Sequence, residues 1–428
     1  MSKDENKQME VTMKKFLAIM IALIMIVSCL PVSAAADASG EKITMLFSAG
    51  GSGKAIQAAA ERFTQATGIE TEVLLFSIDE VYEKQVLSLS HGSSDIDIVA
   101  LNDPWVPMFQ DYLFDLKNDL GDEFLGEFIP GMLETFESDG KVIGIPVRMG
   151  GDVVVYRKDV FASLGIVPAD IQTWDDLYET AHKMTADGKY GWTMGMVEPS
   201  NVVKSWYEFL ICYGGSIMNE NGDGFSFNSD AGIAATEMFK KIVTDCCPPD
   251  ILTYSFNDQI DAMKTGLASM GLLWTSRYPS VNASDGEYSG QFAVLPLIPG
   301  GGNSEGVACV DGWAVGISKY TSNYDACLEF VKFIGSPEEQ LNLAISNSNS
   351  PTIASIYENE EYLAVVPEAV NMNSALEVSV ARPQEVFFSD VEEQLALYIK
   401  LACLGDMSVE DALAECEEKC MEILEDYE

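Results

Sequence analysis

Aromatic and planar polar side chains gather where predicted strands end and loops begin. A sugar ring presents C–H faces that pack on flat aromatic rings, and its rim of hydroxyls suits the paired oxygens and nitrogens of Asp and Arg. This combination of residue types is typical of a carbohydrate-binding site. The candidate ligand contacts are Asp103, Trp105, Arg148, Trp206, Tyr213, Trp274, Asp311, Gly312, Trp313 and Arg382. Core packing is the competing explanation for each aromatic ring, and we expect Trp174 and Trp192 to be structural.

The sequence lacks the common signatures of catalytic and metal sites. It contains neither G-x-S-x-G nor H-E-x-x-H, and its two histidines, His91 and His182, lie far apart and away from any cysteine. The glycine-rich segment 48–55 fails the phosphate-loop pattern, because Ser48 stands at the first Gly and Ala55 at the final Ser or Thr. We expect no cofactor and no metal. Paired carboxylates among 67 acidic residues leave a glycosidase as an alternative.

Alternating strands and helices are predicted to hold these residues in place. Segments 43–47, 70–76 and 95–101 are apolar strands, and segments 52–67 and 81–89 are helical, the first with Ser52 as its expected cap. A β-α-β-α-β order with apolar strands predicts a parallel sheet covered by helices on both faces. Ligands bind beyond the carboxyl ends of such strands, where segments 48–53 and 102–105 lie.

The stretch 144–161 is predicted to carry the chain from one lobe to a second. Its apolar segment 153–156 is a strand that ends at the charged residues 157–159, and Thr173 with Asp176 forms a capping box for the next helix. Residues 148–152 are expected to face the gap between the lobes. The predicted fold is α/β, with two lobes that each hold a mostly parallel sheet and with three crossovers. The later helices are predicted at 174–186, 202–213, 230–244, 256–265, 324–334, 337–345, 391–404 and 409–426, and the later strands at 268–274 and 314–317.

Length and charge narrow the class of protein further. A chain of 428 residues is too long for one ordinary core and predicts two domains. The 25 basic and 67 acidic residues give a net charge of −42, which disfavours nucleic acid and anionic lipid as partners. The nine cysteines show no C-x-x-C spacing, and the sequence does not fix any disulfide pairing.

The N-terminal segment predicts export. Residues 1–12 are a polar extension, and Met13-Lys14-Lys15 followed by the apolar segment 16–27 is typical of a signal peptide rather than a membrane span. The small residues before Ala35 favour cleavage after Ala34, which would release a free protein. Segment 26–29 resembles a lipobox instead, in which Cys29 would carry a lipid anchor.

An ordered series of short motifs resembles the extracellular solute-binding proteins of ABC importers, in the family that binds sugars, oligosaccharides and polyols. The resemblance extends from Glu41 to the end of the chain. The motifs are GIP at 144–146, YRKDVF at 156–161, TWDDL at 173–177, YGG at 213–215, MKTGLASM at 263–270 leading to Trp274, DGW at 311–313 and ARP at 381–383.

The resemblance implies two α/β lobes that close on one ligand, a carbohydrate ligand, and permease subunits as membrane partners. We also expect a monomer that binds no nucleic acid. It implies that Trp274 stacks on sugar, that the segment ending in Trp313 lines the cleft, and that Arg382 binds hydroxyls. Asp311 departs from the family pattern, which has Gly there. We expect a signal segment at 1–34, one lobe from 41–147 with 312–350, and the other from 148–311 with 351–428. A non-sugar solute such as a polyamine, or a glycosidase activity, remains the alternative.

Overall fold

The computed structural model describes residues 42–302, 304–347 and 350–427. The predicted signal peptide and Cys29 lie outside the described residues. Within the described ranges, no helix combines the length and the apolar character needed to cross a membrane.

Three parallel strands begin the first lobe, as the sequence predicts. β1 (Lys42–Ser48) lies between β2 (Glu70–Phe76) and β3 (Ile98–Asn102), and α2 (Gly51–Thr67) and α3 (Ile78–Ser90) connect them. The side chains of Ser77 and Glu80 form a capping box at the start of α3. The predicted cap at Ser52 is wrong, because α2 already begins at Gly51 and Gly50 occupies the cap position with a φ of 117°.

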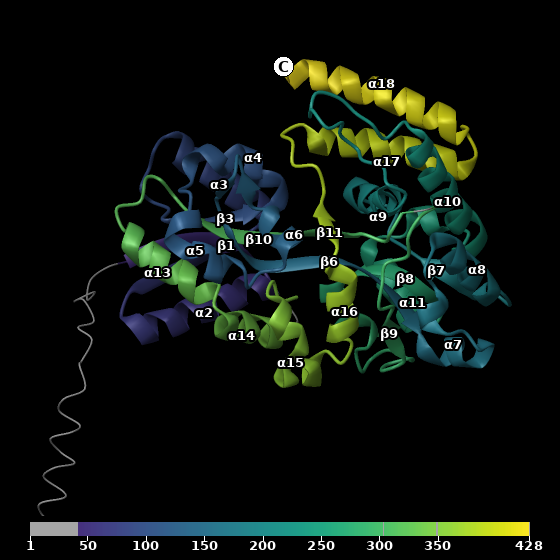
Figure 1. Ribbon diagram of the computed structural model, residues 1–428, viewed down its shortest axis with the longest axis horizontal. Helices are drawn as coiled ribbons and strands as arrows, with labels where there is room; N and C mark the ends of the chain where they lie inside the picture. Colours follow the sequence, from purple (N-terminus) through teal and green to yellow (C-terminus); the bar gives the residue numbers. More distant parts are fainter. Residues whose placement is uncertain (1–41, 303, 348–349, 428) are drawn as a thin grey trace, which may run out of the picture.

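The long strand β6 (Ile145–Arg157) passes from one lobe to the other (Figure 1). Its first half pairs with β10 (Ala308–Ile317), and its second half pairs with β8 (Ala268–Trp274) and β9 (Phe292–Val294). β7 (Tyr190–Thr193) runs parallel to β8, and β11 (Ser379–Ala381) runs parallel to β10. The main strand order is β2-β1-β3-β10-β6-β8-β7, so one mixed sheet extends through both lobes.

One strand prediction needs correction. β10 begins at Ala308 rather than at 314, because its first residues already pair with β11 and β6. Trp192 lies in β7, paired with Met270 of β8, and its side chain is fully buried.

Helices cover the sheet on both sides of β6. Figure 1 places α13 and α14 beside α2 in the first lobe, and α17 and α18 beyond α9 in the second. The side chains of Thr173 and Asp176 cap α8 as predicted. The first-lobe helices are α4 (Val106–Phe109), α5 (Lys117–Leu125), α6 (Pro130–Glu134), α13 (Tyr324–Ile334) and α14 (Pro337–Asn347). The remaining α-helices of the described residues are α7 (Lys158–Leu164), α8 (Trp174–Met184), α9 (Pro199–Cys212), α10 (Asp230–Cys246), α11 (Phe256–Lys264), α12 (Tyr278–Val281), α15 (Glu360–Val365), α16 (Ala369–Leu376), α17 (Phe388–Leu404) and α18 (Val409–Tyr427).

The short elements complete the fold. A small separate hairpin consists of β4 (Glu137–Ser138) and β5 (Lys141–Val142). The short 3-10 helices are η1 (Asp103–Trp105), η2 (Gln110–Tyr112), η3 (Pro168–Asp170), η4 (Ile251–Thr253), η5 (Thr275–Arg277) and η6 (Ala354–Glu358).

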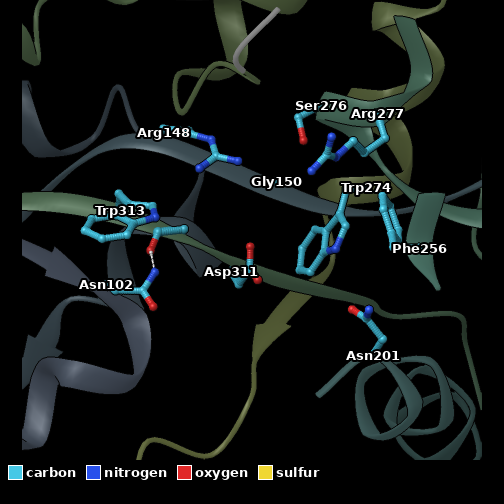
Figure 2. A pocket seen from close by; sticks show the side chains of 11 residues that line it. Asn102, Arg148, Gly150, Asn201, Phe256, Trp274, Ser276, Arg277, Asp311 and Trp313 are labelled. Atoms are coloured by element: carbon cyan, nitrogen blue, oxygen red, sulfur yellow. Dashed lines mark hydrogen bonds between the residues drawn. The ribbon is translucent and has the colours of Figure 1, made fainter. Parts of the chain in front are cut away.

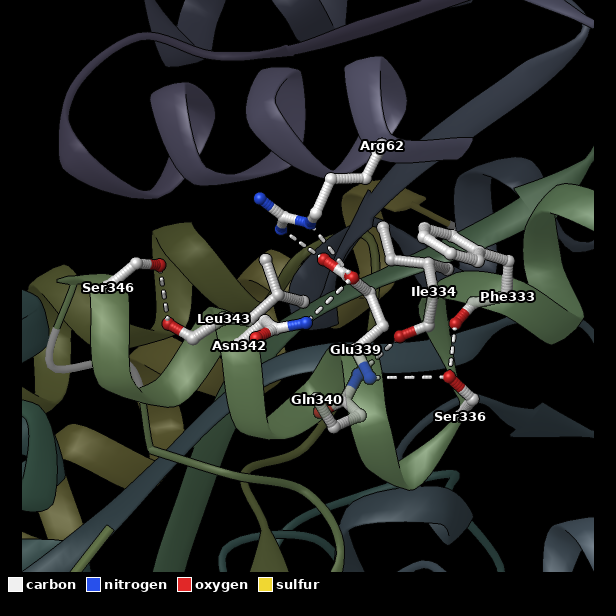
Figure 3. A network of polar contacts seen from close by, with 9 residues as sticks. All are labelled: Arg62, Phe333, Ile334, Ser336, Glu339, Gln340, Asn342, Leu343 and Ser346. Carbon is white, nitrogen blue, oxygen red and sulfur yellow. Dashed lines mark hydrogen bonds and ion pairs between the residues drawn. The ribbon is translucent and has the colours of Figure 1, made fainter. Parts of the chain in front are cut away.

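An ion pair connects α14 to α2 in the first lobe (Figure 3). The guanidinium of Arg62 binds both carboxylate oxygens of Glu339, with 3.1 Å between Nε and Oε2. The Asn342 side chain donates to the same carboxylate at 3.3 Å. Because Glu339 is buried, these donors compensate a charge that would otherwise be costly to remove from water.

The eight cysteines within the described residues are all free and buried. Cys416 and Cys420 lie one turn apart on α18, with 3.9 Å between their sulfur atoms. The described residues contain no group of three or more His, Cys, Asp or Glu side chains arranged to hold a metal ion.

Candidate functional site

A pocket lies where β6 passes from one lobe to the other, and residues from both halves of the sheet line it. We call it the central pocket; its volume is about 300 Å³. Figure 2 shows its side chains pointing toward one space from β3, β6, β8, β10 and the starts of α9 and α11. Its lining residues are Asn102, Arg148, Gly150, Asn201, Phe256, Trp274, Ser276, Arg277, Asp311, Gly312 and Trp313.

Two tryptophans stand on opposite sides of the central pocket. Trp274 ends β8, and Trp313 lies in β10 in register with Arg148 of β6. Gly150 allows the close approach of Trp274, because a β-carbon there would lie 3.2 Å from the indole ring. Trp274 is partly exposed and can offer a ring face, whereas Trp313 is only 5% exposed and has little surface left for a ligand.

Polar groups lie between these tryptophans. The Asn102 side chain donates to the Gly312 carbonyl at 3.0 Å, which fixes its orientation at the pocket wall. Asp311 projects into the pocket with 31% of its side chain exposed. Burial lowers the pKa of the Arg148 guanidinium, while the negative charge of Asp311 acts in the opposite direction. The arrangement can bind hydroxyl or charged groups beside an aromatic face.

A buried lysine packs against one face of the Trp274 ring. Lys204 of α9 places its Nζ 3.6 Å from the centroid of the indole ring and 2.6 Å from Oδ1 of Asp152. Asp152 is in register with Trp274 across β6 and β8 and is fully buried. Burial raises the pKa of Asp152 to about 6, although the charge of Lys204 opposes this shift. The cation–π contact and the ion pair therefore fix one side of the indole.

A second cavity, which we call the side pocket, has a volume of about 310 Å³ and contains three other predicted contacts, Asp103, Trp105 and Arg382. Arg382 lies 2.8 Å from the carboxylate of Glu392, 3.7 Å from that of Asp103 and 3.8 Å from that of Asp311. Burial raises the pKa of Asp103 to about 7, and the charge of Asp311 adds to the shift. The Arg382 guanidinium is thus occupied by protein carboxylates rather than free in the central pocket.

The structure brings half of the predicted contacts to the central pocket: Arg148, Trp274, Asp311, Gly312 and Trp313. Trp206, also predicted as a ligand contact, lines neither the central pocket nor the side pocket. It is fully buried in the second lobe, and its indole N–H donates to the Thr236 hydroxyl at 2.8 Å. Tyr213 lies outside both pockets, in a shallow depression along α10.

Four lining residues were not predicted as part of the site: Asn201, Phe256, Ser276 and Arg277. Asn102 lies in the segment 102–105 that the sequence places beyond a strand end, although it is not among the candidate contacts. Ser276 and Arg277 follow Trp274 by only two and three residues, so the strand-end rule that identified Trp274 could have included them. Asn201 and Phe256 lie at helix starts, and their position at the pocket depends on how α9 packs against β10 and how α11 packs against β8.

The fold and the pocket define a two-lobe binding protein of the periplasmic type, and comparisons with known proteins agree. The sequence profile of the bacterial extracellular solute-binding protein family matches residues 48–341. The chain belongs to this family. It is an ABC transporter solute-binding protein and not an enzyme.

Three relatives illustrate the range of the similarity. A Sinorhizobium fredii protein described as a probable amino-acid ABC transporter periplasmic-binding protein is 23% identical over 80% of each chain. The maltose-bound MalE3 of T. maritima is 26% identical with a TM-score of 0.74, covering 90% of this chain and all of that one. The sugar-binding protein MalE of Xanthomonas citri is 16% identical with a TM-score of 0.80, covering 90% and 98%.

Proposed function

We propose that this protein captures a saccharide in the central pocket and delivers it to an ABC permease. The observation that carries the proposal is the pairing of a partly exposed indole, Trp274, with the polar groups of Asn102, Arg148 and Asp311 around one small cavity. An aromatic face beside hydroxyl-binding side chains suits a sugar ring. The sugar-bound state of the T. maritima relative supports this class of ligand.

Capture proceeds by closure of the two lobes around the ligand. β6 and β10 both pass between the lobes, so small changes in these strands can move one lobe relative to the other. A ligand that contacts Asn102 from the first lobe and Trp274 from the second binds the closed state more tightly and shifts the population toward it. The closed form then docks on the permease, and opening releases the saccharide.

Location and assembly follow from the same proposal. The family is extracellular, and the N-terminal segment predicts export with cleavage near Ala34 or lipid attachment at Cys29. We propose a monomer that meets its permease at the outer face of the cell membrane, with the lobes divided at 147/148, 311/312 and 350/351.

An amino acid is the second candidate ligand, because the S. fredii relative is described as a probable amino-acid binder. In the central pocket, Arg148 and Arg277 could hold its carboxylate and Asp311 its ammonium. A polyamine suits the pocket less well, because two guanidinium groups would repel it.

Thermal melting against a panel of saccharides, polyols and amino acids tests the proposal. A ligand that binds only the folded state raises the melting temperature by mass action. We expect a concentration-dependent rise with at least one saccharide. A rise with amino acids alone, and with no carbohydrate, contradicts the proposed ligand class while leaving the solute-binding role in place.

A further inference from the structure

Two arginines in the central pocket have no carboxylate partner among the described residues. The sequence contains five arginines. Arg62, Arg157 and Arg382 each form an ion pair with a carboxylate. Arg148 and Arg277 form none within the described part of the chain, yet both line the same pocket. With 67 acidic residues in the chain, carboxylate partners are abundant, so this placement indicates a pocket kept positive for its ligand.

The two guanidinium groups enter the pocket from opposite sides (Figure 2). Arg148 projects from β6, and Arg277 ends the turn that follows β8. The Cζ atom of Arg277 lies 5.2 Å from the centroid of the Phe256 ring, a contact that orients the guanidinium without neutralising it. The positive charge of Arg277 adds to the effect of burial in lowering the pKa of Arg148.

Asp311 is the one acidic residue among the described residues that line the pocket, so the formal charge of the lining is +1. This value matches a ligand with a single negative charge. A carboxylate has two oxygens that fit the planar donor pairs of guanidinium groups. A phosphate monoester would bring a second negative charge close to Asp311, which the lining does not balance.

Building on the saccharide function proposed above, we propose that the ligand is an acidic saccharide with a carboxylate, such as a uronic acid residue. Arg148 and Arg277 hold this carboxylate between them, and the sugar ring packs on Trp274. Arg277 is not among the contacts predicted from the sequence, so the second positive charge of the pocket is evident only in the structure.

Isothermal titration calorimetry with matched ligand pairs tests this inference. The pairs are glucuronic acid with glucose, galacturonic acid with galactose, and an acidic disaccharide with its neutral counterpart, with glucose 6-phosphate and amino acids alongside. In at least one pair we expect the acidic member to bind about 10- to 100-fold more tightly, the usual range for a charge-assisted contact. Added salt should reduce this preference, because it screens the guanidinium charges.

Two variants assign the preference to residues. Arg277→Gln and Arg148→Gln should bring the affinity for the acidic member close to that for the neutral one. Arg62→Gln is the matched control, because it removes an arginine of the same charge that does not line the pocket, and it should leave the preference unchanged. Circular dichroism of each variant establishes that it is folded.

The outcomes separate this inference from the proposed function. If no acidic saccharide binds more tightly than its neutral counterpart, or if glucose 6-phosphate binds more tightly than every uronic acid, the inference is overturned. Tight binding of a neutral saccharide in that case leaves the proposed function standing. Binding of amino acids alone overturns both. Full retention of the preference in Arg277→Gln and Arg148→Gln also refutes the assignment.

Discussion

Replacing Lys204 with Met should destabilise the protein in a pH-dependent way. The substitution keeps a long, unbranched side chain under Trp274 but removes the ammonium that lies 2.6 Å from Asp152. Asp152 is fully buried, and its Oδ2 has no hydrogen-bond partner among the described residues. Removing one partner of a buried ion pair costs about 3–5 kcal/mol, because the other charge remains buried and unpaired.

The protonation of Asp152 sets the pH range of this cost. Its pKa in the folded protein is about 6, above the ordinary value of 3.8, so its contribution to stability is complete below pH 3.8 and is lost as the pH rises through about 6. Without Lys204 the folded pKa rises further, and the loss continues at higher pH. Each additional pKa unit costs about 1.4 kcal/mol. The difference between wild type and Lys204→Met should therefore be small near pH 5 and grow toward pH 8.

Urea unfolding followed by far-ultraviolet circular dichroism measures this difference in the free energy of unfolding. The matched control is the double variant Lys204→Met/Asp152→Asn, which removes both charges and should recover much of the stability at about pH 8. A cost that is the same at about pH 5 and about pH 8, or no recovery in the double variant, would refute the reasoning.

Three further substitutions test separate parts of the account. Trp274→Ala should weaken saccharide binding by about 1–3 kcal/mol, the value of one large apolar contact, and unchanged affinity by calorimetry would remove Trp274 from the site. Trp206→Phe should lower the free energy of unfolding by about 1–3 kcal/mol, because it deletes the buried hydrogen bond to Thr236, and should leave ligand affinity unchanged; a loss of affinity instead would return Trp206 to the binding residues. Arg62→Ala should cost about 3 kcal/mol of stability, because it leaves the buried Glu339 carboxylate without its cation, and a cost below about 1 kcal/mol in urea unfolding would show that the pair does not hold α14 to α2.

Local patterns in the sequence were enough to predict most of the elements. The strands 70–76 and 268–274 match β2 and β8, because apolar runs with clear stops define a buried strand without tertiary information. The capping box of Thr173 and Asp176 was readable for the same reason, since all of its atoms lie within four residues. These features depend on neighbours along the chain.

The site depended on contacts between distant segments and was predicted less completely. The sequence could not distinguish a buried core role for Trp206 from a ligand-binding role. α9 is buried from Val202 to Cys212, so no exposed polar face shows which side of the helix points into the core. The ion pairs of Arg382 join residues up to 279 positions apart, so no spacing rule could show that its guanidinium is occupied. Arg277 was not predicted, because the feature that distinguishes it is a guanidinium without a carboxylate partner among the described residues. Only the folded structure shows which carboxylates lie near it.

A crystal structure grown with the saccharide that raises the melting temperature most tests the central claim directly. We predict a sugar ring against Trp274 in the central pocket, with its polar groups contacting Arg148 and Asp311 and with the two lobes closed around it. A saccharide bound in the side pocket, or on the surface with the central pocket empty, would contradict the account.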